Sequence, residues 1–468
     1  MASTSDALSA ALAGLSTTRA LIDTVSRNVT NASTPGYTRK TQDTITGPLG
    51  AVITGPVARQ VDDALNRSIR ESTSAASKLD VTASMLSQIE TAFGSPDANS
   101  SLSGAITQLQ TAFSNLSTNP QKSTLYQAVI DSGNNLATTF HQLYADVETV
   151  RTTADSQITD AVNTVNQTLD QLQQVNASIS SDTSGDTTDL QDKQDQLLSS
   201  LSKQLDIVTF KKSNGAVAVY TKSGTQLLDV TVNHLSPTNI AAPPLVAPAP
   251  NAVLIGGGTI GGLLAMRDQT APQIESQLDD MARAITQQFQ GTGVELFNDA
   301  GSTSFNPSAV PPAVATPLAA YASRIAVNSA VVANPTYLRD GTPTGSPPTP
   351  QPVLDSGDTT NIDKAVALFQ DTTISFNSAT GLPATGSLAG VAGEFISGVS
   401  NSQTSAQNAL DYQNTLTQSF TTKQSTISGV NIDDEMGHLV QLQQAYAANA
   451  RLIQTAQDLM NDLLNAVK

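Results

Sequence analysis

The residues that most resemble a chemical site are the glycines of Gly256–Gly261, which fit the dinucleotide-binding pattern G-x-G-x-x-G. A strand-like run, Ala252–Ile255, precedes them, and Asp279 lies about where a ribose-binding acid would stand. However, Asp279 falls inside the helix predicted over Ala271–Phe289 instead of at the end of a second strand. We therefore interpret these glycines as a flexible return into a helix, and we expect no cofactor there.

No other pattern in the sequence favours catalysis. The three histidines, His141, His234 and His438, are scattered, without an H-E-x-x-H motif or a carboxylate at ligand spacing. There is no G-x-S-x-G motif and no P-loop. The chain has no cysteine, which excludes disulfides, thiolate metal sites and a cysteine nucleophile. The sequence therefore predicts no catalytic, cofactor or metal site, and a protein that is not an enzyme.

Composition narrows the class of partner. The 468 residues carry a net charge of −17, spread without blocks of like charge, which argues against nucleic acid. No stretch of 18 apolar residues occurs, so we predict no membrane insertion. We also expect no Sec-type signal peptide. The first positive charge is Arg19, and no apolar segment precedes a small-residue cleavage site.

Two helices with apolar seams are predicted, one near each end of the chain. The first covers Ser3–Asn31 and ends before the turn residues Pro35 and Gly36, and the second covers Asp433–Val467. Their apolar residues recur at gaps of three, four and seven, which is heptad spacing. These residues are Leu8, Leu12, Leu15, Ile22, Val25 and Val29 in the first helix, and Leu439, Leu442, Tyr446, Ile453, Met460, Leu463 and Val467 in the second.

Neither terminal helix is expected to be stable alone. Burying six aliphatic side chains contributes roughly 9–18 kcal/mol. Ordering some 25 backbone residues costs on the order of 25–50 kcal/mol before hydrogen bonds offset it. Each helix therefore needs a partner, and the other terminal helix, together with further copies of the chain, is the obvious candidate.

Between these ends we predict a mainly α fold with a β-rich insert. Helical spacing extends over Asp62–Phe93, Ser101–Leu116, Ser123–Ile179 and Leu190–Leu205, and strands with a hairpin turn are indicated at Ile207–Phe210 and Ala216–Tyr220. We expect three parts: paired terminal helices at 1–40 and 430–468; a long helical bundle at 41–205, 259–291 and 394–429; and a β-rich, loop-rich outer domain at 206–258 and 292–393, with Pro343–Pro352 as an exposed loop.

The two ends carry motifs that resemble a known family. Ser26–Arg39, which reads SRNVTNASTPGYTR, resembles the N-terminal signature of the flagellar axial proteins that build the rod, hook and hook junctions. Ser428–Glu435, SGVNIDDE, followed by Ala445–Tyr446 and Ala448–Ala450, resembles the matching C-terminal signature. Segments between them resemble the hook-associated branch in order: Leu116–Pro120, Asp192–Leu198 and Gly261–Asp268. The resemblance covers about residues 8–290 and 394 to the end, and it fades between about 294 and 393.

The resemblance implies a structural subunit of the bacterial flagellum, located outside the cell in the junction ring between hook and filament. It implies four partners: the hook protein, a second junction protein, copies of the chain itself, and a cytoplasmic export chaperone on the C-terminal helix. It also implies type III export without a cleaved signal. The expected assembly interface comprises the seam residues given above together with Asn28, Asn31, Pro35, Gly36, Tyr37, Asn431 and Asn449.

Two alternative functions remain open at this stage. Another axial subunit, from the hook or rod, is disfavoured by the long helical stretch from Asp62 to Leu205. A secreted coiled-coil adhesin would be supported by a Sec signal or an anchoring motif, and the sequence offers neither.

Overall fold

The computed structural model describes residues 2–47, 52–95, 98–182, 185–242, 252–300, 320–343 and 351–466. The chain forms two compact units: unit 1 comprises Met1–Ser77, Ala161–Ile260 and Asp411–Lys468, and unit 2 comprises Lys78–Asp160 and Gly261–Leu410. Three long helices contribute to both units: α2 (Asp63–Phe93), α4 (Ser123–Ser181) and α11 (Leu388–Ser428). The fold is mainly α with a β-containing insert, as the sequence predicts.

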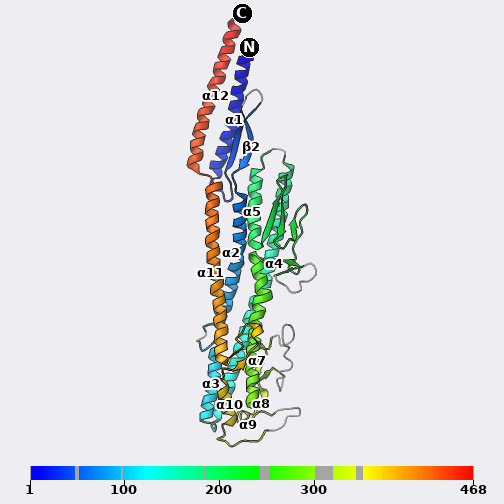
Figure 1. Ribbon diagram of the computed structural model, residues 1–468, viewed down its shortest axis with the longest axis vertical. Helices are drawn as coiled ribbons and strands as arrows, with labels where there is room; N and C mark the ends of the chain where they lie inside the picture. The colour runs from blue at the N-terminus through cyan, green and yellow to red at the C-terminus, as the bar shows by residue number, and fades with distance from the viewer. Residues whose placement is uncertain are drawn as a thin grey trace. The chain divides into compact units, whose positions relative to one another are not determined.

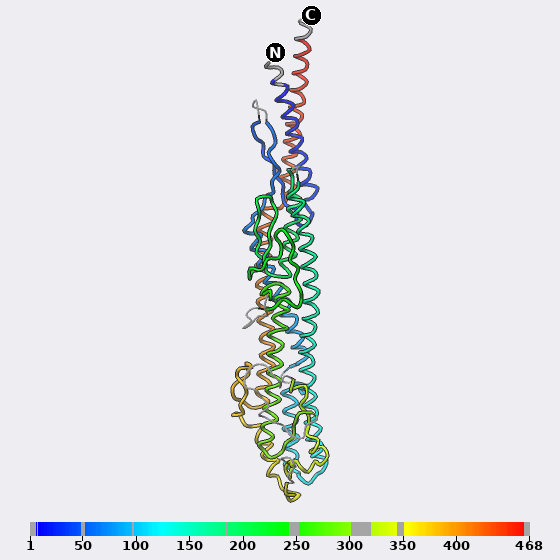
Figure 2. Tube along the Cα trace, turned by 90° about the vertical axis from the view of Figure 1, so that its right-hand side faces the viewer, coloured from blue at the N-terminus to red at the C-terminus, as the bar shows by residue number. Residues whose placement is uncertain are grey.

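Unit 1 contains three elements from the ends of the chain, lying side by side. They are α1 (Ala2–Asn31), α12 (Ile432–Ala466) and a hairpin of β1 (Lys40–Thr46) and β2 (Val52–Arg59). Figure 1 shows α1 between the hairpin and α12, and in both views the two helices run antiparallel (Figures 1 and 2). The Thr17 hydroxyl donates to the Val52 carbonyl at 2.8 Å, which fixes the hairpin on α1. One face of α1 therefore packs on strands and another packs on α12.

The rest of unit 1 is a helical layer with a small sheet. Parts of α2, α4 and α11 lie with α5 (Thr188–Gln204), and β3 (Ile207–Lys211), β4 (Val217–Thr221) and β5 (Gln226–Leu228) form an antiparallel sheet in that order. β6 (Ile240–Ala241) and β7 (Val253–Leu254) pair in parallel. The buried Asn176 side chain on α4 bonds the backbone of Val217 and so joins helix to sheet.

Unit 2 packs its helices around phenylalanines. Phe113, Phe289, Phe297 and Phe369 are buried, with ring centroids 5.5–6.2 Å apart in contacting pairs. These rings concentrate apolar area in a chain that has few aromatics. The smaller elements of this unit are α3 (Leu102–Thr118), α6 (Gly258–Ala265, which begins in unit 1), the π-helical turn η2 (Met266–Thr270), α7 (Ala271–Thr292), β8 (Phe297–Asp299), β9 (Ile325–Val327), α8 (Ser329–Ala333), α9 (Tyr337–Asp340), α10 (Thr360–Leu368), β10 (Ile374–Ser375), the 3-10 turn η4 (Ser378–Thr380) and β11 (Thr385–Gly386).

Most predicted helices are confirmed within two or three residues, since their periodicity is unbroken over many turns. The β1–β2 hairpin differs from the sequence prediction, which places residues from 41 onward in a helical bundle. The described part of 292–393 contains short helices as well as short strands. Most of Pro343–Pro352 lies outside the described residues, and the division into three parts stays a prediction.

Candidate assembly site

The seam between α1 and α12 is built from small and medium side chains at heptad spacing. On α1 the residues in or near this seam are Leu8, Ala11, Leu15, Thr18, Ile22, Val25 and Val29, all buried or half-buried. On α12, Leu439, Leu442, Asn449 and Ile453 are half-buried. The Asn449 amide approaches Gly14 and the Thr18 hydroxyl, so this close contact depends on a glycine in α1. The structure thus brings the two predicted seams together.

Leu12 is the exception on α1, because 51% of its surface is exposed. A repeat through Leu8, Leu15, Ile22 and Val29 has a seven-residue period, and Ala11 takes the position between the first two. The sequence favoured Leu12 because it is larger, whereas the helix geometry places the smaller Ala11, only 7% exposed, against α12. Leu12 therefore lies outside the seam of the single chain.

α12 leaves large apolar side chains uncovered. Apart from the seam residues Tyr446 and Met460, which stay more than 40% exposed, the uncovered residues lie on the flanks of the helix. A shallow hollow lined by Arg19, Ile22, Gln443 and Tyr446 lies between the two helices. Sequence analysis missed these flank residues, because they lie outside the heptad seam from which the interface was predicted. They are Ile432, Met436, Val440, Leu452 and Leu459, each between 44% and 58% exposed.

Where α1 ends and α12 begins, a buried asparagine joins the two terminal helices. Asn28, 1% exposed, donates to the Lys40 carbonyl at 2.9 Å and to Glu435 Oε2 of α12 at 3.1 Å. Its Oδ1 accepts from the Lys40 N–H and from the Tyr37 hydroxyl, both at 2.9 Å. All four hydrogen-bonding positions of the amide are therefore used. Such a residue fixes the register of a helix pair, because slippage would leave it buried and unpaired.

Glu435 is the matching residue on α12. It is 1% exposed, and its second oxygen accepts from Arg39 Nε at 2.6 Å. The Arg39 backbone N–H donates to the Ser428 carbonyl at 2.8 Å, just before α12 begins. The sequence showed Glu435 only as one of three acids in the first turn, and nothing in the pattern marked it as buried.

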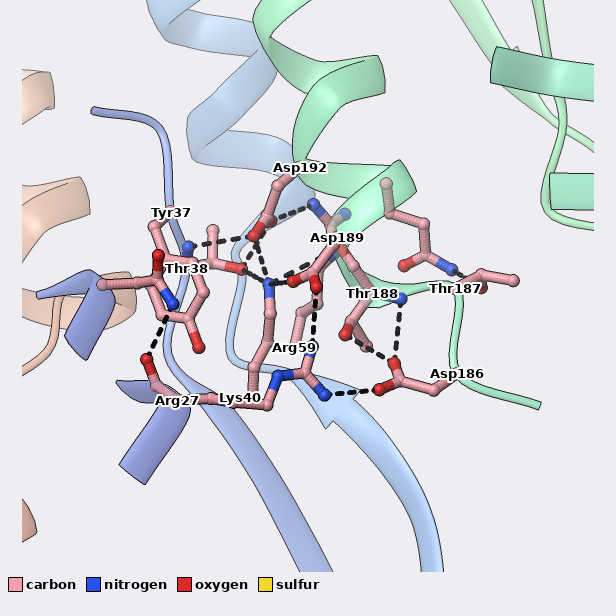
Figure 3. Close-up of polar contacts among 12 residues, drawn as sticks. Arg27, Tyr37, Thr38, Lys40, Arg59, Asp186, Thr187, Thr188, Asp189 and Asp192 are labelled. Atoms are coloured by element: carbon pink, nitrogen blue, oxygen red, sulfur yellow. Dashed lines mark hydrogen bonds and ion pairs between the residues drawn. The ribbon is translucent and has the colours of Figure 1, made fainter. Parts of the chain in front are cut away.

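A cluster of charges ties the hairpin to α5 (Figure 3). The Lys40 ammonium is fully buried and pairs with Asp192, and it lies 4.5 Å from the centroid of the Tyr37 ring. Asp192 also accepts from Arg59 Nη1 at 2.9 Å and from the Thr38 hydroxyl at 2.6 Å. These contacts compensate the cost of burying the carboxylate and the ammonium, which would be several kcal/mol for each ion alone.

Three further ion pairs extend this cluster. Arg27 of α1 reaches Asp186 and Asp189, each at 2.7 Å, and Arg59 reaches Asp195 at 2.8 Å. Burial raises the pKa of the neighbouring Tyr37 phenol to about 12, so it stays a neutral hydrogen-bond donor at physiological pH. The charges hold α1, the hairpin and α5 in one arrangement without forming a site for chemistry.

The remaining motif residues shape the turns. Gly36 has φ +77, and a Cβ there would lie 2.5 Å from the Gln196 amide nitrogen, which donates to the Pro35 carbonyl. Asn31 bonds the Arg27 carbonyl and the Thr34 hydroxyl locally. Asn431 accepts from the Asp433 N–H and so caps α12. The side chain of Leu463 and all of Val467 lie outside what the structure describes.

Asp279, His141 and His234, three of the residues weighed for chemistry, have structural partners. The Asp279 carboxylate accepts from the backbone N–H groups of Ala320 and Ala322, at 3.0 and 2.8 Å. His141 bonds the Ile325 carbonyl, and His234 bonds Asp170. The residues with a described placement include no group of three or more histidine and acidic side chains suited to a metal ion. Among the helices described, none is long and apolar enough to cross a membrane.

Comparisons with known proteins agree with this arrangement. Residues 86–305 match the family described as the flagellar hook-associated protein FlgK helical domain, and residues 424–466 match the flagellar basal body rod FlgEFG protein C-terminal family. The chain is 24% identical to flagellar hook-associated protein 1 of Salmonella typhimurium, over 97% of this chain and 98% of that protein. It is 26% identical to the same protein of Bacillus subtilis, over 49% of each chain.

This chain belongs to the flagellar hook-associated protein 1 family. The fold agrees, because the hook junction protein FlgK of Burkholderia pseudomallei superimposes with a TM-score of 0.60, at 16% identity, over 78% of this chain and all of that one. As a member of the hook-associated protein 1 family, the chain is a structural protein of the hook–filament junction. The rod-protein family match covers the end of α11 and α12, the C-terminal member of the helix pair.

Proposed function

We propose that this protein forms the junction ring between hook and filament by assembling with copies of itself through α1 and α12. The observation that carries the proposal is the one-sided cover of α12. One face packs on α1, while the flank residues Met436, Val440, Leu452 and Leu459 stay largely exposed. A helix with apolar residues on several sides is typical of one that is covered by further chains.

Covering these flanks contributes favourable free energy to assembly. Fully burying an exposed Leu, Met or Val side chain contributes about 1.5–3 kcal/mol, and these four are already about half-buried. Covering them therefore contributes roughly 3–6 kcal/mol per copy before the entropy of association is subtracted. Within the single chain, several seam residues are only half-buried. Assembly would therefore complete both the flank contacts and the helix pair, and folding of the termini is coupled to it.

The buried Asn28 and Glu435 give this assembly a defined geometry. They hold α12 in one register on α1, and the Lys40–Asp192 cluster holds the hairpin on α5 in the same unit. A subunit in a ring must present its two contact surfaces at a fixed angle, because a heterologous interface closes only at one rotation. In our proposal the polar contacts supply that rigidity and the apolar flanks supply the affinity.

The same exposed flanks offer contact surfaces for partners other than copies of the chain. The hook protein would lie on one side of the ring, and a second junction protein on the other. Before assembly, α12 would expose its apolar flanks in the cytoplasm, where they favour aggregation. A cytoplasmic export chaperone that covers the C-terminal helix would prevent this. Type III export without a cleaved signal completes the proposal.

The test replaces one flank residue and compares it with a matched polar neighbour. Val440→Asp puts a charge on the exposed flank, and Gln444→Asp puts the same charge one turn along, on an exposed residue that is already polar. Each variant is expressed in cells that lack the native gene. Electron microscopy then shows which structures form, and flagellin is assayed in the medium.

We expect Val440→Asp to give hooks without filaments and flagellin released into the medium, with Gln444→Asp close to normal. Normal filaments with Val440→Asp would refute assembly through this flank. The deletion strain separates the alternatives: absent hooks would place the protein in the hook or rod. Normal filaments in that strain would leave only the adhesin.

A further inference from the structure

Unit 2 contains a buried carboxylate that the assembly role does not use. Glu275 lies on α7 and is 7% exposed, and its Oε1 atom has no hydrogen-bond partner among the described residues. A buried carboxylate with an unpaired oxygen is costly when it is ionised, because neither water nor a donor compensates the charge. The side chains around Glu275 therefore decide whether it is ionised.

The groups around Glu275 come mainly from α4. Arg151 Nη1 lies 3.1 Å from Glu148 Oε2 and 3.8 Å from Glu275 Oε2, so two carboxylates share one guanidinium. Tyr144 on α4 and Asp279 on α7 also interact with the pair. One helical turn beyond Arg151, Asp155 forms an ion pair with Arg267. Arg324, just before β9, interacts electrostatically with Asp279 and opposes the rise in its pKa. Negative charge therefore exceeds positive charge at this contact.

The titration behaviour agrees with that geometry. Burial, together with a hydrogen bond to Glu148, raises the pKa of Glu275 to about 7. Burial also raises the pKa of Asp279 to about 6, despite its backbone donors. Burial and the same carboxylates raise the pKa of the Tyr144 phenol, so it stays neutral. Near neutral pH, Glu275 is thus the group at this contact that gains or loses a proton.

We propose that Glu148 and Glu275 hold one proton between them across the α4–α7 contact, forming a latch that acidification closes and alkaline pH loosens. In the closed state the O–H of one carboxyl donates to the carboxylate oxygen of the other. When the proton leaves to solvent, two carboxylates lie beside the guanidinium of Arg151, which offsets part of their repulsion. The latch is independent of the helix pair in unit 1, and it goes beyond the junction role.

The direction of the effect follows from linkage. The folded chain holds the proton up to about pH 7, whereas an exposed glutamate releases it near its ordinary pKa of about 4.3. Opening of the contact therefore releases a proton between these values. Protection of α7 should be fully present below about pH 4.5 and should be lost progressively as the pH rises through about 7.

Hydrogen exchange of the full chain, followed by mass spectrometry, measures this directly. Rates for α7 peptides are compared at pH 5.5 and 8.5 after correction for the intrinsic pH dependence of exchange. We expect the protection factor to fall about tenfold to thirtyfold between the two values, as linkage gives for a pKa near 7. Glu275→Gln keeps the shape but cannot be charged, and it should reduce that fall to about fourfold, which is what a pKa of about 6 at Asp279 gives by itself.

Two further variants make the outcome decisive. Glu394→Gln changes an exposed glutamate of unit 2 and should leave the fall unchanged. Asp279→Asn should leave most of the fall in protection, and this result would assign the pH dependence to Glu275 instead of Asp279. A wild-type chain with equal protection at both pH values would overturn the latch, as would a fall that persists undiminished in Glu275→Gln.

Discussion

Replacing Lys40 with methionine tests the charge cluster most directly. The two side chains are similar in length and volume, so Lys40→Met mainly removes the ammonium from a position with no solvent exposure. Asp192 keeps Arg59 and Thr38 but loses its shortest contact, while the Tyr37 ring loses a cation over its face. The Thr188 carbonyl and the Asp189 carboxylate also lose the ammonium as a neighbour.

The magnitude follows from these contacts. Removing one partner of a buried ion pair costs about 3–5 kcal/mol, because the other charge is left without compensation. Here Asp192 retains one cation and one hydroxyl donor, so we expect the lower end, about 3 kcal/mol. At about 1.4 kcal/mol for each tenfold change, the unfolding equilibrium constant would rise roughly 100-fold.

The assay is urea unfolding of the full chain followed by far-ultraviolet circular dichroism, with hydrogen exchange to locate the change in β1, β2 and α5. Lys193→Met is the matched control, because Lys193 is the exposed residue next to Asp192 on the same helix. We expect the control to shift stability by less than about 0.5 kcal/mol. Equal effects of the two variants would refute the argument that the buried ammonium stabilises this junction.

Three further predictions concern the same unit. Leu442→Asp or Ile453→Asp should block incorporation into flagella, because each charge would enter the half-buried seam; an unchanged circular dichroism spectrum of the body would show that only the termini are affected. Gly36→Ala should cost more than Gly185→Ala in thermal unfolding, by about 1 kcal/mol or more, since both have positive φ but only the first would contact a neighbour; equal costs would contradict this. Tyr37→Phe should cost about 1 kcal/mol for its lost hydrogen bond, with no pH dependence between pH 6 and 9.

The missed hairpin shows where sequence reasoning stops. Lys40–Thr46 contains one apolar residue, Ile45, and its last four residues are exposed, so the sequence shows no apolar face. The strand forms because β2 pairs with it and because Gln42 bonds the Gly55 carbonyl across the pair. Both interactions depend on a partner in the other strand, and the residue types of one strand do not reveal that partner.

The amino-acid sequence by itself determined the two terminal helices, the long helical stretches, the exclusion of thiolate and disulfide chemistry, and the resemblance to axial proteins. Those inferences depend on local periodicity and on residue types, which are fully present in the chain. The turn at Gly36 belongs to the same group, since a positive φ favours glycine wherever it occurs.

Only the tertiary structure decided which residues of these helices face each other and which remain open. It placed Ala11 in the seam instead of Leu12, buried Glu435 against Asn28, and gathered Lys40, Arg59 and Asp192 in one cluster. The physical reason is that burial of a charge is paid back by partners from other segments, here more than 100 residues away. Only the folded chain brings those partners together.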